Sequence, residues 1–260
     1  MKNILITGEG SYIGMCFENY IKEFPDYSVE TLDMINPEWE KKDFSSFDVI
    51  YHVAGIAHRK ETEENAHLYY DVNRDLTIKV AEKAKREGVK HFIFLSSMSV
   101  YGVEEGVITR ETPPSPKSNY GKSKIQAEEK LNELADENFL VAIMRPPMVY
   151  GDGCKGNYQM LVKFAKMLPV FPDFKNERSM VHVDNLSKFV KDLIDGEKTG
   201  LFFPQDENYT CTCQMVKEIG KDMGKNIKLL KIMNPAVWLL RKFTTVGKKA
   251  FGDLIYKIEK

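Results

Sequence analysis

The sequence predicts an α/β protein with a doubly wound parallel sheet and a small C-terminal lobe. Short runs that are apolar throughout alternate with helical stretches over residues 4–144. That alternation is typical of a parallel sheet covered by helices on both faces. Prolines and glycines cluster after Arg145, and the later elements are shorter. The length of 260 residues suits one large domain with a smaller appendage. We therefore expect a sheet domain over residues 1–150 and a lobe over residues 151–260.

Each expected element follows from its local pattern. The predicted strands lie at residues 4–7, 29–33, 49–54, 91–95 and 140–144, and all but the second are largely apolar runs. The predicted helices of the sheet domain lie between them, at residues 13–24, 66–86 and 120–135. The second of these helices repeats an apolar residue every four positions, which places those residues on one face. In the C-terminal half we expect short helices at residues 158–167, 185–194 and 215–223.

Charge and composition exclude several classes of protein. Lys and Arg number 37 against 38 Asp and Glu, so no basic surface for nucleic acid is expected. The chain has no apolar run of 18 residues, so no integral membrane span is expected. The N-terminal apolar run is too short for a signal peptide. The four cysteines form no CxxC pair, which argues against a metal site and favours reduced thiols in a cytoplasmic protein.

One apolar segment near the C-terminus has two interpretations. Residues 236–243 are largely apolar, and cations lie within and after them. A helix of this kind can lie on a membrane surface. We favour a closing helix of the lobe, because the apolar run is short and the flanking cations are few.

A glycine-rich turn follows the first predicted strand and precedes a helix. Glycines let the backbone approach a pyrophosphate, which the amides of the helix N-terminus then bind. The turn and helix start that we assign to this site comprise Gly8, Gly10, Ser11, Tyr12, Ile13 and Gly14. Asp33 ends the next strand, where a carboxylate binds ribose hydroxyls and repels a 2′-phosphate. The pattern therefore predicts a dinucleotide site that favours NAD over NADP.

A serine, a tyrosine and a lysine form a second candidate site. Tyr120 and Lys124 are four residues apart at the start of a predicted helix, so they share one face. An ammonium there is expected to lower the pKa of the tyrosine, which then exchanges a proton with a hydroxyl of the substrate. Ser97 follows the strand at residues 91–95, at the sheet edge where ligands bind. We expect Ser97 to hydrogen-bond the same hydroxyl.

These motifs resemble the extended short-chain dehydrogenase/reductase superfamily, and more narrowly its NAD-dependent nucleotide-sugar epimerase/dehydratase family. The segments that carry the resemblance are Thr7-Gly8-x-x-x-x-x-Gly14, His52-Val53-Ala54-Gly55, Asn73, Ser97-x-x-Val100-Tyr101-Gly102, Tyr120-x-x-x-Lys124, residues 145–151 and residues 178–184. The match covers about residues 1–190. It implies a Rossmann-type domain, bound NAD, and a UDP-linked nucleotide-diphosphate sugar as the partner of the lobe.

The resemblance also implies roles for individual residues. Tyr120 would be the general acid or base, Lys124 would bind the nicotinamide ribose, and Ser97 would bind the reacting hydroxyl. Further cofactor contacts would come from Asp43, Ala54, Gly55, Asn73, Ser96 and Pro146. Substrate contacts would come from Ser97, Met98, Asn157 and Arg178, the last because its planar guanidinium can pair with a diphosphate. Ser11 replaces the usual middle glycine of the turn, so a slightly rearranged turn is expected.

Three functions stay open on these residues. Met98 and Ser99 stand where 4,6-dehydratases of the family carry Asp and Glu, so 4,6-dehydration is not expected. We favour a UDP-glucose/galactose-type 4-epimerase of surface-polysaccharide precursor synthesis, because Asp33 favours retained NAD. Met148 favours the alternative, an NAD(P)H-dependent UDP-4-keto-6-deoxyhexose 4-reductase, because epimerases usually carry a substrate-contacting asparagine there. A non-catalytic NAD-sensing protein is disfavoured because the serine, tyrosine and lysine are all present.

The resemblance finally implies a mode of assembly. Family members commonly form homodimers through two helices, which correspond here to residues 66–86 and 120–135. We therefore expect a homodimer as the candidate assembly.

Overall fold

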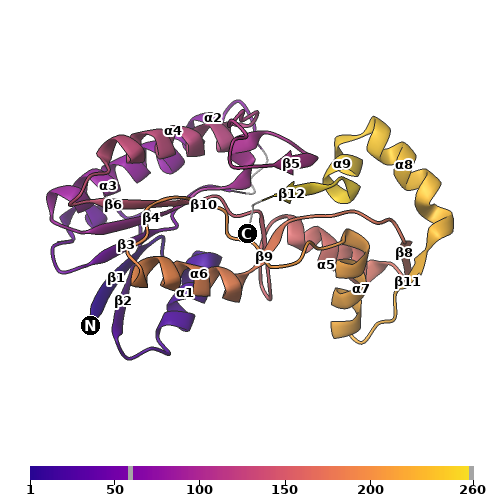
Figure 1. Cartoon of the computed structure of the whole chain (residues 1–260), viewed down its shortest axis with the longest axis horizontal. Helices are drawn as coiled ribbons and strands as arrows, with labels where there is room; N and C mark the ends of the chain where they lie inside the picture. Colours follow the sequence, from indigo (N-terminus) through magenta and orange to yellow (C-terminus); the bar gives the residue numbers. More distant parts are fainter. Residues whose placement is uncertain (58–60, 258–260) are drawn as a thin grey trace. The chain divides into compact units, whose positions relative to one another are not determined.

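The computed structural model describes residues 1–57 and 61–257, which form two compact units (Figure 1). The first unit comprises Met1–Gly102, Pro114–Pro147 and His182–Pro204. The second comprises Val103–Pro113, Met148–Val181 and Gln205–Lys260. The chain thus returns to the first unit after residue 181, which the sequence pattern did not indicate.

A six-stranded parallel sheet is the centre of the first unit. Its strands are β1 (Lys2–Thr7), β2 (Tyr27–Leu32), β3 (Val49–His52), β4 (His91–Leu95), β6 (Leu140–Met144) and β10 (Gly200–Phe202). They lie in the order β10-β6-β4-β3-β1-β2, and every neighbouring pair is parallel. The predicted α/β class with a parallel sheet is therefore confirmed. The chain leaves β1 toward β2 and then returns to β3 on the other side of β1. Ligands of such sheets bind at this switch point, outside the carboxyl ends of the strands.

Helices cover both faces of this sheet (Figure 1). One face carries α1 (Tyr12–Ile21) and α6 (Val183–Asp195), which pack against each other. The other carries α2 (Ala66–Tyr70), α3 (Thr77–Arg86) and α4 (Asn119–Leu134). We expected the helix at residues 185–194 in the C-terminal lobe, and it instead belongs to the sheet unit as α6. Its apolar residues Leu186, Val190 and Leu193 are buried.

The expected helix at residues 66–86 is interrupted. A π-helical segment, η2 (Asp71–Leu76), separates α2 from α3 and contains the fully buried Asn73. Such π-bulges insert an extra residue into a helix and are frequent at functional sites.

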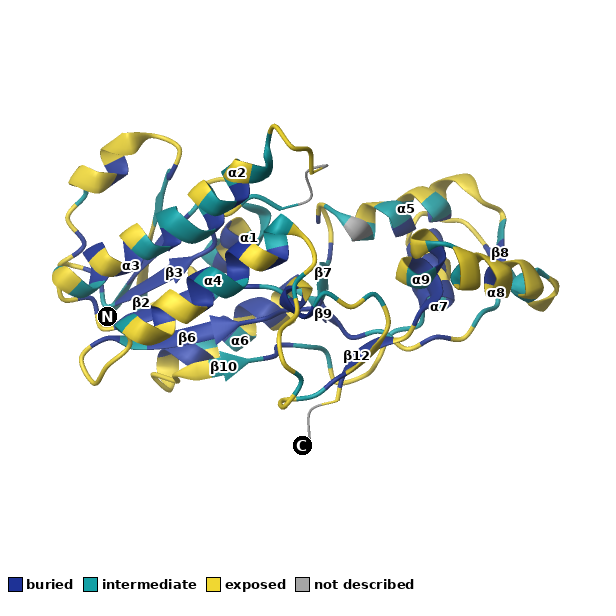
Figure 2. Cartoon of the chain, turned by 90° about the horizontal axis from the view of Figure 1, so that it is seen from above, coloured by how far each residue is buried: buried dark blue, intermediate teal, exposed yellow. Residues whose placement is uncertain are grey.

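The core of the first unit forms where the apolar strands meet the inner faces of α3 and α4. It includes Leu5, Ile50, Phe92, Val141, Val80, Ala84, Ala127 and Leu131. Figure 2 shows these strands as buried and the outer helix faces as exposed. Burial on both faces explains why the inner strands β1, β3, β4 and β6 read as largely apolar runs, whereas the edge strand β2 is only partly buried and contains polar residues.

The second unit is built from short elements. Its helices are α5 (Asn157–Met167), α7 (Thr212–Asp222), α8 (Asn234–Phe243) and α9 (Thr245–Phe251). Its strands are β5 (Gly106–Ile108), β7 (Met148–Tyr150), β8 (Val170–Pro172), β9 (Met180–His182), β11 (Lys228–Leu230) and β12 (Leu254–Tyr256). They pair as β5 with β12, β7 with β9 and β8 with β11. Among the residues that the structure describes, no helix combines the length and apolar character needed to cross a bilayer.

Candidate active site

The glycine turn after β1 is packed closely against the end of β3. Gly8 has a φ of +118°, and a Cβ built there would lie 2.8 Å from the backbone nitrogen of Ala54. The carbonyl of Leu32 accepts hydrogen bonds from the amides of Gly8 (2.9 Å) and Glu9 (3.1 Å). The turn is therefore fixed between the ends of β2 and β3. Glycine is required at residue 8 for its backbone angle and for this close approach.

The beginning of α1 completes this turn. Ser11 is the N-cap residue, and its hydroxyl accepts a hydrogen bond from the amide of Gly14 at 3.2 Å. Tyr12 and Ile13 begin the helix. Gly10 has a φ of +72° and open space around its Cβ position. The serine in place of the usual middle glycine thus has a structural reason, because it caps the helix.

The two predicted cofactor carboxylates lie in different places: Asp33 is next to the glycine turn, whereas Asp43 lies in a separate turn before β3. Asp33 directly follows Leu32, whose carbonyl binds the glycine turn, and its Oδ1 accepts a hydrogen bond from the Ile35 amide at 2.8 Å. Asp43 is exposed in a turn before β3, where its Oδ1 accepts from the Ser45 amide at 2.8 Å. That backbone hydrogen bond lowers the pKa of Asp43. Asp33 is therefore placed next to the glycine turn, as its predicted role requires.

These features together fit a dinucleotide. The turn leaves open space at Gly10, the N-terminus of α1 supplies amides for a pyrophosphate, and Asp33 lies beside them. Ala54 and Gly55 follow β3 at the same edge, and Gly55 is exposed.

We expect Gly8→Ala to abolish NAD binding. The added Cβ would meet the backbone of Ala54 at 2.8–2.9 Å in a conformation that L-residues rarely adopt. The measurement is the NAD content of the purified protein after denaturation. Gly88→Ala is the matched control, because Gly88 also has a positive φ (+85°) but nothing lies within 4 Å of its Cβ position. Equal NAD content in both variants would contradict the close-packed turn.

Lys124 is buried at the carboxyl ends of β3 and β4. Its Nζ donates to the Leu95 carbonyl at 2.8 Å and lies 4.6 Å from the centre of the Phe94 ring. A Cβ at Gly55 would lie 3.3 Å from this Nζ. Burial lowers the pKa of Lys124 to about 7, because the charged form loses solvation, and the carboxylate of Glu128 opposes that shift. Lys124 therefore lies at this edge of the sheet and loses part of its charge near neutral pH.

Ser97 and Tyr120 meet at the same edge. Tyr120 lies in the first turn of α4, which the Ser118 side chain caps by accepting from the Gly121 amide at 3.1 Å. Burial raises the pKa of Tyr120, and its contact with the Ser97 side chain partly opposes that shift. The Ser97 hydroxyl itself donates to Ser99 Oγ and accepts from the Ser99 amide, both at 3.1 Å. The structure thus brings the predicted hydroxyl pair together.

The expected effect of Lys124 on Tyr120 is not seen in this structure. Burial dominates, and the pKa of Tyr120 is raised rather than lowered. The Lys124 ammonium is bound to the Leu95 carbonyl and is itself partly discharged near neutral pH. The helical spacing of four residues predicted a shared face but not these competing contacts.

Asn73 connects the loop after β3 to α4. Its Oδ1 accepts from the Ile56 amide at 2.7 Å, and its Nδ2 donates to the Ile56 carbonyl at 3.0 Å and to Ser123 Oγ at 3.2 Å. A Cβ at Gly55 would lie 3.0 Å from Asn73 Oδ1. Asn73 therefore holds the loop that carries Gly55 against the helix that carries Lys124.

A buried ionic network lies directly behind the site, and the sequence analysis missed its central residue, Glu128. The Glu128 carboxylate is bound by Arg145, with 2.5 Å from Nη2 to Oε2, and accepts a hydrogen bond from the Ser96 hydroxyl. Arg145 Nη1 also donates to the Tyr101 hydroxyl at 2.8 Å. The signal was present in the sequence, because Glu128 continues the four-residue spacing of Tyr120 and Lys124.

Three more predicted residues lie beside this network. Ser96 is buried, and its hydroxyl is committed to Glu128 rather than open to a ligand. Pro146 is also buried, and its carbonyl accepts from the amide of Met98 at 3.0 Å. Met98 is nearly buried, with 9% of its surface exposed.

The other two predicted substrate residues belong to the second unit. Arg178 pairs with Thr210 through two backbone hydrogen bonds, and its Nη1 donates to the Gly252 carbonyl at 2.9 Å. Burial lowers the pKa of Arg178, and the nearby Glu104 and Asp253 oppose that effect. Asn157 begins α5, and its side chain lies outside what the structure describes.

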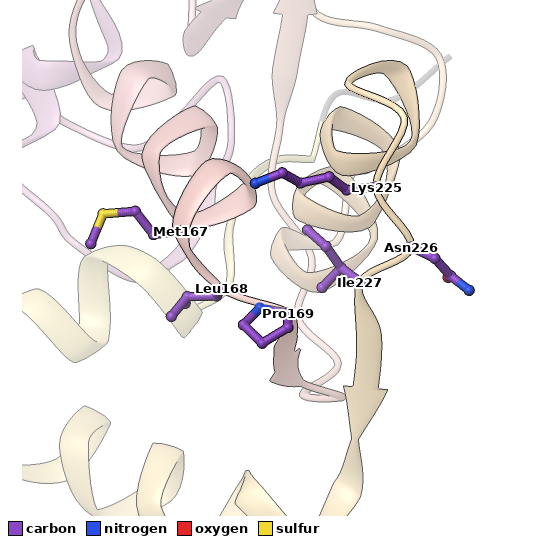
Figure 3. A pocket seen from close by; sticks show the side chains of 6 residues that line it. All are labelled: Met167, Leu168, Pro169, Lys225, Asn226 and Ile227. Atoms are coloured by element: carbon purple, nitrogen blue, oxygen red, sulfur yellow. The ribbon is translucent and has the colours of Figure 1, made fainter.

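A pocket of about 300 Å³ opens in the second unit (Figure 3). It is lined by Met167, Leu168, Pro169, Lys225, Asn226 and Ile227. None of these is a predicted site residue, and the Lys225 ammonium donates to the Lys166 carbonyl. We therefore do not assign the reaction to this pocket.

The parallel sheet, glycine turn and Ser97–Tyr120–Lys124 edge define the class of Rossmann-type proteins that carry out oxidation and reduction with a nicotinamide dinucleotide. Within that class, the chain belongs to the NAD dependent epimerase/dehydratase family, whose sequence profile matches residues 4–199. It is therefore an enzyme of this family, and its cofactor is NAD.

Individual relatives agree with this assignment. The chain is 30% identical to a UDP-glucose 4-epimerase of Vibrio cholerae, over 97% of this chain and 84% of that protein. It is 29% identical to an N-acetyl-alpha-D-glucosaminyl-diphospho-ditrans,octacis-undecaprenol 4-epimerase of Escherichia coli O157:H7, over 90% and 76% of the two chains. Its fold is similar to that of a UDP-glucuronic acid 4-epimerase from Bacillus cereus in complex with NAD, with a TM-score of 0.72 and 19% identity over 96% and 95% of the chains.

Proposed function

We propose that this enzyme is a 4-epimerase of UDP-linked sugars of the glucose/galactose type. The observation that carries the proposal is that Ser97 lies beside Tyr120 at the sheet edge, with Lys124 buried on the same helix as Tyr120 and bound to the Leu95 carbonyl at the end of β4. A sugar hydroxyl at this edge would meet both a proton acceptor and a hydrogen-bond donor. The Vibrio cholerae relative, a UDP-glucose 4-epimerase, supports the substrate class.

The proposed chemistry assigns proton transfer to Tyr120. As the phenolate, Tyr120 would take the proton of the C4 hydroxyl as that carbon is oxidised, and as the phenol it would return the proton when the carbon is reduced from the other face. Ser97 holds the same hydroxyl in position by a hydrogen bond. NAD, when bound, supplies the acceptor and donor of hydride. Lys124 would hold the ribose of the cofactor, since its Nζ lies where β3 and β4 end.

The remaining site residues have binding roles in the proposal. The amides of Gly10 and of Tyr12 and Ile13 at the start of α1 would bind the pyrophosphate, and Asp33 the adenosine ribose. Arg178 would bind the diphosphate of the sugar nucleotide. We further propose cytoplasmic action in surface-polysaccharide precursor synthesis, as a homodimer through α2–α3 and α4.

A 4-ketoreductase is the second candidate function. The observation that favours it is Met148, the apolar residue at the start of β7, at the position where epimerases usually carry a substrate-contacting asparagine. A reductase would use reduced cofactor as a co-substrate, whereas an epimerase regenerates its NAD in every cycle.

We expect purified protein to contain close to one NAD per chain and to interconvert UDP-glucose and UDP-galactose without added cofactor. NAD is measured after denaturation, and the sugars by chromatography of the nucleotide products. The sugar–diphospho-polyprenol named for the Escherichia coli relative is assayed in parallel, because it shares the sugar diphosphate. Protein that is empty and consumes NADPH only with a UDP-4-keto-6-deoxyhexose would overturn epimerisation and establish the reductase.

A further inference from the structure

Helix α8 carries an apolar surface that its own unit does not cover. Of the 15 large hydrophobic side chains that are exposed in the described residues, six lie within residues 232–246. They are Ile232 (85% exposed), Trp238 (59%), Leu239 (55%), Leu240 (41%), Phe243 (69%) and Val246 (61%), which we call the α8 stripe. Figure 2 shows most of α8 as exposed. Single exposed apolar residues are ordinary, but a concentration of this kind marks an interaction surface.

The stripe residues at the centre of α8 lie on one side of the helix. Leu239, Leu240 and Phe243 are spaced three and four residues apart, so they lie on one side of α8. Val237 and Arg241, also four apart, form the side that faces the unit. Val237 is the only fully buried residue of α8, and the Arg241 guanidinium lies 5.3 Å from the Phe174 ring centre. The helix thus lies on the surface of its unit with an apolar side turned outward.

Helix α9 holds α8 in this position. A Cβ at Gly247 would lie 2.4 Å from the carbonyl carbon and oxygen of Leu240, so the two helices cross in backbone contact. The Thr244 hydroxyl caps α9 by accepting from the Gly247 amide at 2.9 Å. Ala250 and Phe251 anchor α9 in the core of the unit. The stripe is therefore presented by a fixed helical hairpin.

The charge around the stripe is predominantly positive. Residues 231–252 contain Lys231, Arg241, Lys242, Lys248 and Lys249, with no Asp or Glu. Glu104 and Glu105 form ion pairs with three of these cations, Arg241, Lys248 and Lys249, at 3.3–3.9 Å, so the five cations outnumber the two carboxylates. Lys242 Nζ lies 5.2 Å from the ring centre of Trp238, at the border of the stripe.

We propose that the α8–α9 hairpin docks the enzyme on the surface of an anionic lipid bilayer. Leu and Phe on one side of a short helix, with Trp and Lys at its border, match a helix that lies in the headgroup region. The lysines would meet anionic headgroups while their stems and Trp238 border the apolar layer. A seam between protein chains would place fewer cations beside its apolar centre.

Vesicle binding of the full chain tests this proposal. We expect co-sedimentation with vesicles of phosphatidylcholine and phosphatidylglycerol, weaker binding to phosphatidylcholine alone, and release at high salt. Tryptophan fluorescence provides a second signal, because Trp238 is exposed and the other tryptophan, Trp39, is buried. The emission of Trp238 should shift to shorter wavelength on binding. The variant Leu239→Ser/Phe243→Ser should reduce the bound fraction about tenfold. Its stripe residues are exposed, so its NAD content and turnover should stay those of the parent.

Ile35→Ser is the matched control, since Ile35 is 93% exposed in the first unit. Vesicle binding that is the same in all three proteins, or absent throughout, would overturn the proposal. A parent that is dimeric, with the double variant monomeric and neither bound to vesicles, would instead assign the stripe to a second copy of the chain. Because these readouts do not depend on turnover, failure of docking and failure of the epimerase assignment are distinguishable.

Discussion

Tyr120→Phe is expected to lower the turnover number about a thousandfold while NAD content stays that of the parent. The change removes only the phenolic oxygen, which we assign to proton transfer, and general acid–base groups contribute on the order of 10²–10⁴. The ring remains to fill its place beside Tyr69, whose ring centre is 6.4 Å away. The measurements are steady-state turnover with UDP-glucose and NAD released on denaturation.

A neighbouring tyrosine provides the control for this substitution. Tyr69→Phe removes a hydroxyl from the adjacent ring, and we place Tyr69 outside the reaction. It should retain most of the activity. A Tyr120→Phe enzyme that turns over within a fewfold of the parent, with Tyr69→Phe as a valid comparison, would contradict the role of Tyr120.

The inner strands were well predicted because a strand buried on both faces consists of consecutive apolar residues. The runs at 91–95 and 140–144 correspond to β4 (His91–Leu95) and β6 (Leu140–Met144) without change. In a parallel sheet both faces are covered, so every residue of the strand is apolar and its ends are sharp. The helix at 66–86 was predicted from its period, but the π-helical turn depends on the contacts that Asn73 makes with Ile56 and Ser123. Those contacts are distant in sequence.

The return of the chain to the sheet had no such signal. β10 has only three residues, Gly200–Phe202, and its place depends on pairing with β6 at the edge of the sheet. Helix α6 was predicted as a helix, but its partner is α1. Local pattern predicts an amphipathic helix and does not identify which apolar surface it covers.

The site was predicted to a similar degree. Spacing predicted Tyr120 and Lys124 on one helix face, and the end of β4 predicted Ser97 nearby. In the structure Ser97 contacts Tyr120, and Lys124 donates to the Leu95 carbonyl at the end of β4. The roles of these residues in binding and catalysis stay predictions. The sequence predicted a lowered pKa for Tyr120, which is wrong for the protein alone, because burial raises this pKa by more than the Ser97 side chain lowers it. Burial of an individual side chain is a tertiary property that sequence spacing does not carry.

Glu128→Leu is expected to lower the free energy of unfolding by about 3–5 kcal/mol. The substitution leaves the guanidinium of Arg145 buried without its carboxylate, and an unpaired buried charge costs about that much. The Ser96 hydroxyl also loses its acceptor. Urea unfolding measures the change. Glu129→Leu is the matched control, because the adjacent Glu129 is exposed and its loss should change stability by less than about 0.5 kcal/mol.

The same carboxylate also acts on Lys124, which gives this prediction a second, pH-dependent part. Burial lowers the folded-state pKa of Lys124 from 10.5 to about 7, and Glu128 raises it. The folded protein therefore binds fewer protons than the unfolded chain between these values, and this lysine makes the protein less stable as pH falls through that window. Glu128→Gln should extend this loss of folding stability to lower pH, because removing the carboxylate lowers the pKa of Lys124 further. If Glu128→Leu were as stable as Glu129→Leu, and Glu128→Gln kept the parent's pH profile, the network would hold neither Arg145 nor Lys124. The Ser96–Ser97 edge would then need another anchor.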